Sequence, residues 1–189
     1  MAEAISLEGQ AQQAALGGRW AESREAFRRA ARRYRASWEV APPGSYGRLV
    51  GMLKAAILAG GGGEEAVYVR NALGDAGAHS PTAAYAQAIA ALVSGDDRAA
   101  ARWSGHMGAG SDPFARAAAA IAALARRDEQ SYRSAVGAIV EDFAARTDHL
   151  TGVAIADTAL MLEQLAEPRG LRAGVQSRVL PSPAPPASA

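Results

Sequence analysis

Residues 11–38 read AQQAALGGRWAESREAFRRAARRYRASW, and this stretch decides the fold class. Gly17 and Gly18 interrupt one helical pattern, because glycine supplies the left-handed conformation in which many helices end. A second helical pattern follows, with apolar side chains recurring along one side of a 3.6-residue spiral. These side chains are Trp20, Phe27, Ala31, Tyr34 and Trp38. The stretch therefore predicts two helices joined by a short turn, which is a helical hairpin.

The composition extends this prediction to the whole chain. Of its 189 residues, 49% are hydrophobic but only 6% are aromatic, and alanine supplies much of the hydrophobic half. Alanine has the highest helix propensity because it loses no side-chain entropy in a helix. The sequence contains no stretch of alternating β-branched and aromatic residues that would be typical of a half-buried strand. We therefore expect one all-α domain, large enough to bury a substantial core.

Glycine-rich or charged helix-to-helix turns recur along the chain. They begin at residues 18, 61, 95 and 127, which are 43, 34 and 32 residues apart. A period near 34 is the spacing of tetratricopeptide hairpins. The first hairpin resembles that motif at its small, glycine and aromatic positions, namely Ala11, Gly18, Trp20, Phe27 and Ala30. We expect four stacked antiparallel hairpins and a terminal helix, about nine helices in all, arranged as a right-handed tetratricopeptide-like solenoid.

Local signals predict where elements begin and end. Ser45, Ser80 and Asp112 are expected to cap helices, the last two being followed by a proline. The last helix is expected to run from Gly152 to about Glu167 and to be buried by its neighbours, because it is apolar on most sides. Residues 1–168 would then form a single helical-repeat domain, and residues 169–189 an extended, Pro/Ala-rich tail.

Net charge, cysteine content and targeting signals exclude several classes of function. The formal net charge of +1 creates no general attraction to nucleic acid or to an acidic membrane. Without cysteine there is no disulfide, thiolate metal site or thiol nucleophile. Residues 1–16 lack the basic and apolar regions of a signal peptide, and no apolar run approaches the roughly 20 residues of a membrane span. A soluble, cytoplasmic protein is expected, with neither nucleic acid nor a membrane as its partner.

A row of arginines follows one side of the second predicted helix. It consists of Arg24, Arg28, Arg32 and Arg35. Nucleic-acid recognition would also need interleaved aromatic residues or a recognised module. Glu22 and Glu25 share the helix at spacings that allow ion pairs with Arg28, Arg29 or Arg32. A solvated, internally paired face is the preferred interpretation.

No catalytic, metal or cofactor motif stands out. Asp96 and Asp97 are followed by alanines one turn later, so a first-turn position favoured by the helix dipole explains them better than a metal site. None of His79, His106 and His149 has a partner at a metal-ligand spacing on a helix. Serine-nucleophile, phosphate-loop and dinucleotide motifs are absent. We predict no catalytic residues, no metal and no cofactor, and favour a binding protein over an enzyme.

Four residues are candidates for binding a partner. Trp103 and His106 lie in a glycine-rich stretch at the end of a predicted helix, where a large side chain beside flexible backbone can serve as a binding hot spot. A core position is nevertheless the preferred interpretation of Trp103. Tyr46 and Arg48 are assigned to the inner face of the solenoid, which is the usual binding surface of such folds.

The C-terminal half resembles a known family. The resembling stretches are Gly95-Asp96-Asp97, Leu124 to Tyr132, the apolar segment Val153 to Leu165, and Val175 to Pro181. Together they resemble the immunity-forty-nine family of all-α immunity proteins from bacterial polymorphic-toxin systems. The resemblance covers roughly half the chain; the N-terminal half departs from it and looks more like an ordinary tetratricopeptide hairpin. It implies a protein that binds and neutralises a toxin, and it carries over no catalytic residues.

The leading hypothesis is therefore a non-catalytic helical-repeat protein that binds a protein partner, such as a cognate toxin. The alternative is a small-molecule-binding, self-resistance or accessory protein of a biosynthetic cluster, since helical bundles also hold ligands between their helices. A large apolar cavity near Trp103 or Tyr46 would favour that alternative. A third hypothesis, an enzyme of unrecognised type, requires polar residues that converge in a cleft.

Overall fold

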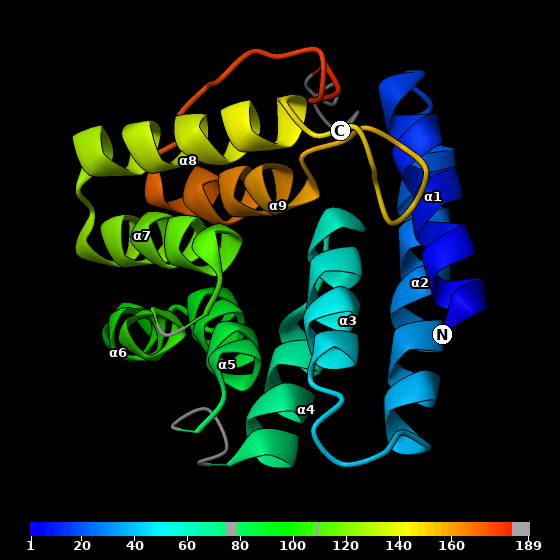
Figure 1. Ribbon diagram of the computed structural model, residues 1–189, viewed down its shortest axis with the longest axis horizontal. Helices are drawn as coiled ribbons and strands as arrows, with labels where there is room; N and C mark the ends of the chain where they lie inside the picture. Colours follow the sequence, from blue (N-terminus) through cyan, green and yellow to red (C-terminus); the bar gives the residue numbers. More distant parts are fainter. Residues whose placement is uncertain (75–78, 109, 183–189) are drawn as a thin grey trace.

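The computed structural model of this protein describes residues 1–74, 79–108 and 110–182, and within them it contains nine α-helices and no β-strand (Figure 1). The first four helices are α1 (Ala2–Leu16), α2 (Trp20–Glu39), α3 (Gly47–Leu58) and α4 (Gly63–Leu73). The others are α5 (Pro81–Val93), α6 (Asp97–Met107), α7 (Asp112–Arg126), α8 (Glu129–Ala144) and α9 (Asp157–Ala166), followed by a short 3-10 helix, η2 (Glu167–Arg169). The all-α prediction, with four hairpins and a terminal helix, is confirmed.

The four hairpin turns share one backbone geometry. Each turn has a residue with positive φ at the equivalent position: Gly18, Gly60, Gly95 and Arg127, with φ angles of 71°, 89°, 72° and 57°. The second turn has a further one, Gly62, with a φ of 113°. The N–H of the following residue donates to the carbonyl oxygen five positions earlier, at 2.9–3.0 Å in all four turns. This Schellman arrangement satisfies carbonyl groups that a helix C-terminus would otherwise leave unpaired. The period inferred from the sequence is thus the period of one repeated turn.

The hairpins pack in chain order. α2 packs against α3, α3 and α4 pack against α5, and α6 packs against α7. Figure 1 shows the hairpins following one another around an arch, from α1 and α2 on one side to α7 and α8 on the other. α9 then returns across the arch and contacts α3, α7 and α8. The last helix therefore joins the end of the chain to its middle.

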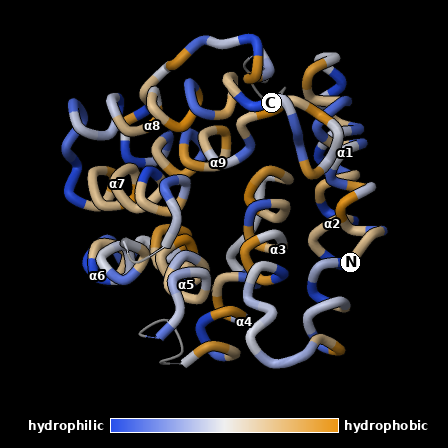
Figure 2. Tube along the Cα trace, in the orientation of Figure 1, coloured by the Kyte–Doolittle hydropathy of each residue, from blue (hydrophilic) through white to orange (hydrophobic). Residues whose placement is uncertain are grey.

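Small side chains allow the helices to approach closely. Every residue of α5 from Ala83 to Leu92 is buried, and Figure 2 shows hydrophobic residues along α3 and α5 where α2 and α6 carry many hydrophilic ones. A Cβ atom added at Gly51 would lie 2.7 Å from a ring carbon of Tyr34, so α3 meets this ring only because position 51 lacks a side chain. None of the helices in the described part of the chain is long and apolar enough to cross a membrane.

The start of the last helix differs from the prediction. It begins at Asp157, not at Gly152, because the preceding residues pack in a non-helical conformation. Val153 and Ile155 are buried beside Ala15, and the N–H of Ala156 donates to the carbonyl oxygen of Val179 at 2.8 Å. A short apolar run suits a buried extended segment as well as it suits a helix, and periodicity cannot separate the two.

Two of the three predicted caps are also wrong in detail. The Ser45 hydroxyl donates to the carbonyl oxygen of Pro42 at 2.8 Å, and α3 starts after Tyr46 without a side-chain cap. Asp112 is itself the first residue of α7, one position later than expected for a cap. Ser80 does cap α5, since its Oγ accepts the N–H of Ala83 at 3.4 Å.

The described part of the predicted tail, residues 169–182, contains no helix or strand beyond Arg169 and packs onto the helices. Residues 171–176 contain neither helix nor strand, and Val179 is only 4% exposed. Residues 183–189 lie outside the described residues. A Pro/Ala-rich end therefore follows a segment that belongs to the folded domain.

Candidate functional site

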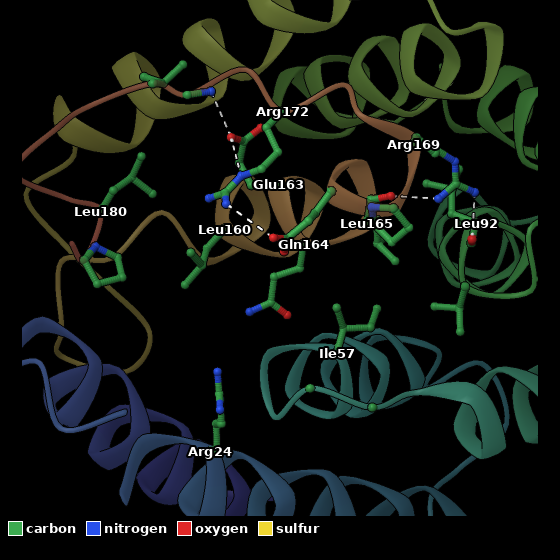
Figure 3. A pocket seen from close by; sticks show the side chains of 18 of the residues that line it. Arg24, Ile57, Leu92, Leu160, Glu163, Gln164, Leu165, Arg169, Arg172 and Leu180 are labelled. Atoms are coloured by element: carbon green, nitrogen blue, oxygen red, sulfur yellow. Dashed lines mark hydrogen bonds and ion pairs between the residues drawn. The ribbon is translucent and has the colours of Figure 1, made fainter. Parts of the chain in front are cut away.

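A cleft of about 1250 Å³ runs along the edge of the stack where the four hairpin turns lie, and we name it the turn-edge cleft (Figure 3). Each turn contributes to its lining: Trp20 from the first, Gly61 from the second, Gly95 from the third and Arg127 from the fourth. The opposite wall is formed by α9 and by residues 167–182. The turns that define the repeat thus also form one wall of this cleft.

The lining combines apolar surface with charge. Figure 3 shows Arg24 of α2 and Gln164 of α9 extending into the open space from opposite sides, with Ile57 and Leu160 nearby. The charged residues of the lining are Arg24, Arg127, Arg169 and Arg172, and Asp97, Glu163 and Glu167. An apolar recess with a few placed polar groups is the usual form of a ligand site.

Glu163 fixes the wall that the tail contributes. Its two carboxylate oxygens accept the N–H groups of Ala173 and Gly174, each at 2.9 Å, and one of them also accepts the Tyr132 hydroxyl at 3.1 Å. Burial, together with the nearby Glu163 charge, raises the pKa of Tyr132, so this hydroxyl remains a donor. One buried carboxylate thereby ties α8, α9 and the tail together.

Arg169 fixes the other end of this wall. Its Nε and Nη2 donate to Asp97 Oδ1 at 3.1 and 2.6 Å, its Nη1 donates to the Leu165 carbonyl at 2.7 Å, and its Nη2 donates to the Leu92 carbonyl at 2.9 Å. The side chain is 9% exposed. A guanidinium can satisfy several fixed acceptors in this way because its donors form a rigid fork. This residue fastens η2 to the α5–α6 turn.

A polar network lies between five helices beside the cleft. Lys54 Nζ of α3 lies 2.6 Å from Asp157 Oδ2 of α9, and the two side chains are 15% and 16% exposed. The Tyr34 hydroxyl of α2 donates to Glu8 of α1 at 2.5 Å. Tyr85 of α5 has a buried hydroxyl that makes no hydrogen bond within the described part of the chain. Thr158 lies near that hydroxyl without hydrogen-bonding geometry.

The lysine and the tyrosines of this network keep their protons. Burial alone would lower the pKa of Lys54, but attraction to the carboxylates, above all that of Asp157, outweighs it and raises the pKa, so the ammonium is no nucleophile. Burial raises the pKa of Tyr34 and of Tyr85, and both keep their protons. The lysine and the two tyrosines are therefore protonated near neutral pH, the state in which they donate hydrogen bonds and do not act as bases.

Glu8 makes stability depend on pH. Burial, as the largest cause, raises its pKa, and the neighbouring Asp157 carboxylate raises it further, whereas Lys54 and Tyr34 act in the opposite direction. A carboxyl whose pKa is higher in the folded than in the unfolded state loses stability as pH rises through the folded value. We therefore expect Glu8→Gln, which mimics the protonated form, to flatten the fall in unfolding free energy as the pH rises above 4.5, the ordinary pKa of a glutamate carboxyl. One titrating carboxyl can account for a slope of at most about 1.4 kcal/mol per pH unit, which limits the size of this effect.

Urea denaturation of the wild type and of Glu8→Gln at a series of pH values from 4.5 upward measures this difference. The matched control is Glu3→Gln, because Glu3 lies on the exposed side of the same helix and pairs with Arg33. Parallel pH profiles for the wild type and Glu8→Gln would show that Glu8 does not titrate as its surroundings require.

Two of the four sequence-predicted binding residues lie at the α2–α3 connection. Tyr46 packs against Trp38, with ring centroids 6.0 Å apart, and precedes the first residue of α3. Arg48 donates from Nη1 to Ser37, both to its carbonyl oxygen and to its Oγ, the latter at 2.8 Å. Arg48 thus has a structural role that links the two helices.

The other two lie on α6. Trp103 is 9% exposed and belongs to the core, in agreement with the core interpretation of this residue. Its ring lies 5.6 Å from that of His106, which is exposed. In Figure 1, α6 and α3 lie on different sides of α5. None of the four lines the turn-edge cleft.

The arginine row is largely paired, as the sequence suggested. Arg28 and Arg32 contact Glu25 at 2.9 and 3.7 Å, and Arg35 contacts Glu39 at 3.2 Å. Arg24 is different, because it has no ion pair among the residues that the structure describes and it lines the cleft. In the sequence, Arg24 belongs to the same row as the paired arginines. It differs from them because it faces α9 across the cleft.

The cleft could have been anticipated from a signal already present in the sequence. The recurring turns were used to count repeats, although a repeated turn also brings equivalent residues to one edge of the stack. Trp20, Gly95 and Arg127 belong to those turns and all line the cleft. The contribution of α9 and of the tail had no such signal.

Searches of protein-family models, of curated proteins and of solved structures found no match to this chain. The fold itself therefore defines the class: this is an all-α protein of stacked antiparallel helical hairpins, closed by a terminal helix.

Proposed function

We propose that this chain is a cytoplasmic, non-catalytic helical-repeat protein that binds a protein partner in the turn-edge cleft. The observation that carries the proposal is that all four hairpin turns, α9 and the tail line one continuous recess. Its volume of about 1250 Å³ exceeds the roughly 300–1,000 Å³ typical of small-molecule pockets. A recess of this size, open along one edge, suits a segment of polypeptide better than a single small ligand.

The resemblance of the C-terminal half to immunity proteins suggests what the partner is. Under this proposal the partner is a cognate toxin, and the hairpins form a right-handed, tetratricopeptide-like solenoid. The small-molecule alternative has less support. It predicts a large apolar cavity near Trp103 or Tyr46, and neither residue lines the turn-edge cleft.

Affinity capture of the tagged chain from its native host tests the proposal, with glycine-to-tryptophan variants that map the binding surface. Gly61→Trp places a large side chain on the lining of the cleft, at a position where a Cβ atom meets no atom closer than 3.7 Å. Gly47→Trp and Gly105→Trp are matched controls, because both positions have open space around them and lie beside Arg48 and His106, respectively.

We expect a stoichiometric protein partner that the wild type and both controls retain and that Gly61→Trp loses. Circular dichroism must show that all three variants keep the helical content of the wild type. Loss of the partner in Gly47→Trp or Gly105→Trp alone would place the interface at the residues predicted from the sequence. Recovery of no partner, or of a small molecule that Gly61→Trp excludes, would overturn the proposal.

A further inference from the structure

Two of the three acidic groups of the turn-edge cleft, Glu163 and Asp97, already accept hydrogen bonds. Glu163 accepts three hydrogen bonds from Tyr132, Ala173 and Gly174. Asp97 Oδ1 accepts two from Arg169. A carboxylate whose oxygens are satisfied by buried donors has little capacity left to attract a cationic ligand. Glu167, which is 66% exposed and 3.7 Å from Arg172, is the remaining acidic residue of the lining.

The basic groups are not occupied to the same extent. Arg24 forms no ion pair among the described residues, and it extends into the open space in Figure 3. Arg127 is 65% exposed and comes no closer than 3.8 Å to Asp97. Arg172 is 48% exposed and contacts Glu163 and Glu167 only at 3.9 and 3.7 Å. The unused charge of the cleft is therefore positive.

Arg127 stands at a position that favours glycine. The first three hairpin turns place glycine at the left-handed residue, and the fourth places Arg127 there, the one non-glycine residue with positive φ in the described part of the chain. A Cβ atom in this conformation approaches the neighbouring carbonyl, so arginine is less favourable here than glycine. A strained residue that lines a recess motivates a functional role for its side chain.

We propose that the turn-edge cleft binds an acidic segment of a protein partner, with Arg127 as an anchor for a carboxylate and Arg24 and Arg172 as further anchors along the cleft. The proposal rests on the proposed function and adds the chemistry of the segment. A guanidinium can bind a carboxylate through two parallel hydrogen bonds, which gives both strength and orientation. Apolar side chains of the segment would pack against Trp20, Ile57 and the other apolar lining residues.

A selection from a library of random displayed peptides on the immobilised full chain tests this chemistry without knowledge of the partner. We expect the enriched peptides to carry acidic residues between apolar ones and to lose binding to Gly61→Trp. Enriched peptides that are neutral or basic would overturn the acidic preference. If Gly61→Trp still excluded those peptides, the cleft would remain the binding site and the proposed function would stand. Enrichment of no peptide that Gly61→Trp excludes would count against both.

Arg127→Gly separates a binding role from a structural one. Removal of the left-handed strain is expected to raise the melting temperature by about 2–4 °C for a chain of this size, while the affinity for the enriched peptides, measured by fluorescence anisotropy, falls by about tenfold or more. Arg24→Ala is expected to weaken the same peptides, whereas Arg28→Ala, which removes an arginine paired with Glu25 outside the cleft, leaves their affinity unchanged. Unchanged affinity in Arg127→Gly would overturn the assignment of this anchor.

Discussion

Replacement of Lys54 with methionine is expected to lower the free energy of unfolding by about 3–5 kcal/mol, the cost of leaving one member of a buried ion pair without its partner. Lys54 is the only lysine of the chain, and its ammonium lies 2.6 Å from Asp157 in a region that also contains Glu8. Without Lys54, the neighbouring carboxyl groups of Asp157 and Glu8 would remain without their cation. The site is largely buried, since the side chains of Lys54 and Asp157 are only 15% and 16% exposed. Urea denaturation near neutral pH measures the loss.

The triple variant Lys54→Met, Asp157→Asn, Glu8→Gln is the control for this prediction. It removes the unpaired charges together with the pair, so most of the lost stability should return, because a neutral, well-packed replacement of a buried ion pair is often nearly as stable. Single and triple variants that are equally unstable would show that Lys54 acts through its packing. A Lys54→Met variant within about 1 kcal/mol of the wild type would contradict the buried-pair interpretation altogether.

Replacement of Arg169 with methionine is expected to cost a similar amount, about 3–5 kcal/mol, because it removes one partner of a largely buried ion pair. Arg169 makes four hydrogen bonds, and its loss leaves the Asp97 carboxylate and the carbonyl groups of Leu92 and Leu165 with fewer donors. Unlike Lys54→Met, this change should also release the tail. Hydrogen exchange of the amides of Ala173 and Gly174 reports on that release, since both donate to Glu163.

Two further variants test how much of the contribution of Arg169 to stability depends on its charge and on the geometry of its donors. Arg169→Lys keeps the charge but lacks the rigid fork of donors, so it should recover less than half of the loss. Asp97→Asn keeps an oxygen acceptor for the arginine and should cost clearly less than Arg169→Met. If Arg169→Met unfolded at the same urea concentration as the wild type, with unchanged exchange of the tail amides, this clamp would not hold the wall of the cleft.

The sequence predicts one wall of the candidate site but not the other. One wall consists of hairpin turns that glycine and aspartate mark in the sequence, so Gly61, Gly95 and Asp97 were located in advance, although they were interpreted as structural. The other wall depends on Glu163 and Arg169, which the sequence analysis did not select. Glu163 meets Tyr132, 31 positions away, and Arg169 meets Asp97, 72 positions away, and no local pattern encodes either contact.

The four proposed binding residues failed to gather at the cleft for a related reason. Tyr46, Arg48, Trp103 and His106 were chosen for their side-chain chemistry and for an assumed inner face. Which face a hairpin presents depends on the angle at which it packs on the next one, and that angle results from side-chain shapes along both helices. The burial of Trp103 and the bond from Arg48 to Ser37 follow from this packing.

The sequence by itself determined the helices, the four turns between them and the pairing of neighbours in chain order. These features depend on residues within a few positions of one another: a glycine that can adopt positive φ, a proline that ends a helix, and apolar side chains at helical spacing. The tertiary structure alone decided that α9 begins at Asp157, that it crosses to Lys54, and that the tail closes one side of a cleft. Those outcomes require the whole arch to be in place first, because each joins groups that become neighbours only after the hairpins between them have stacked.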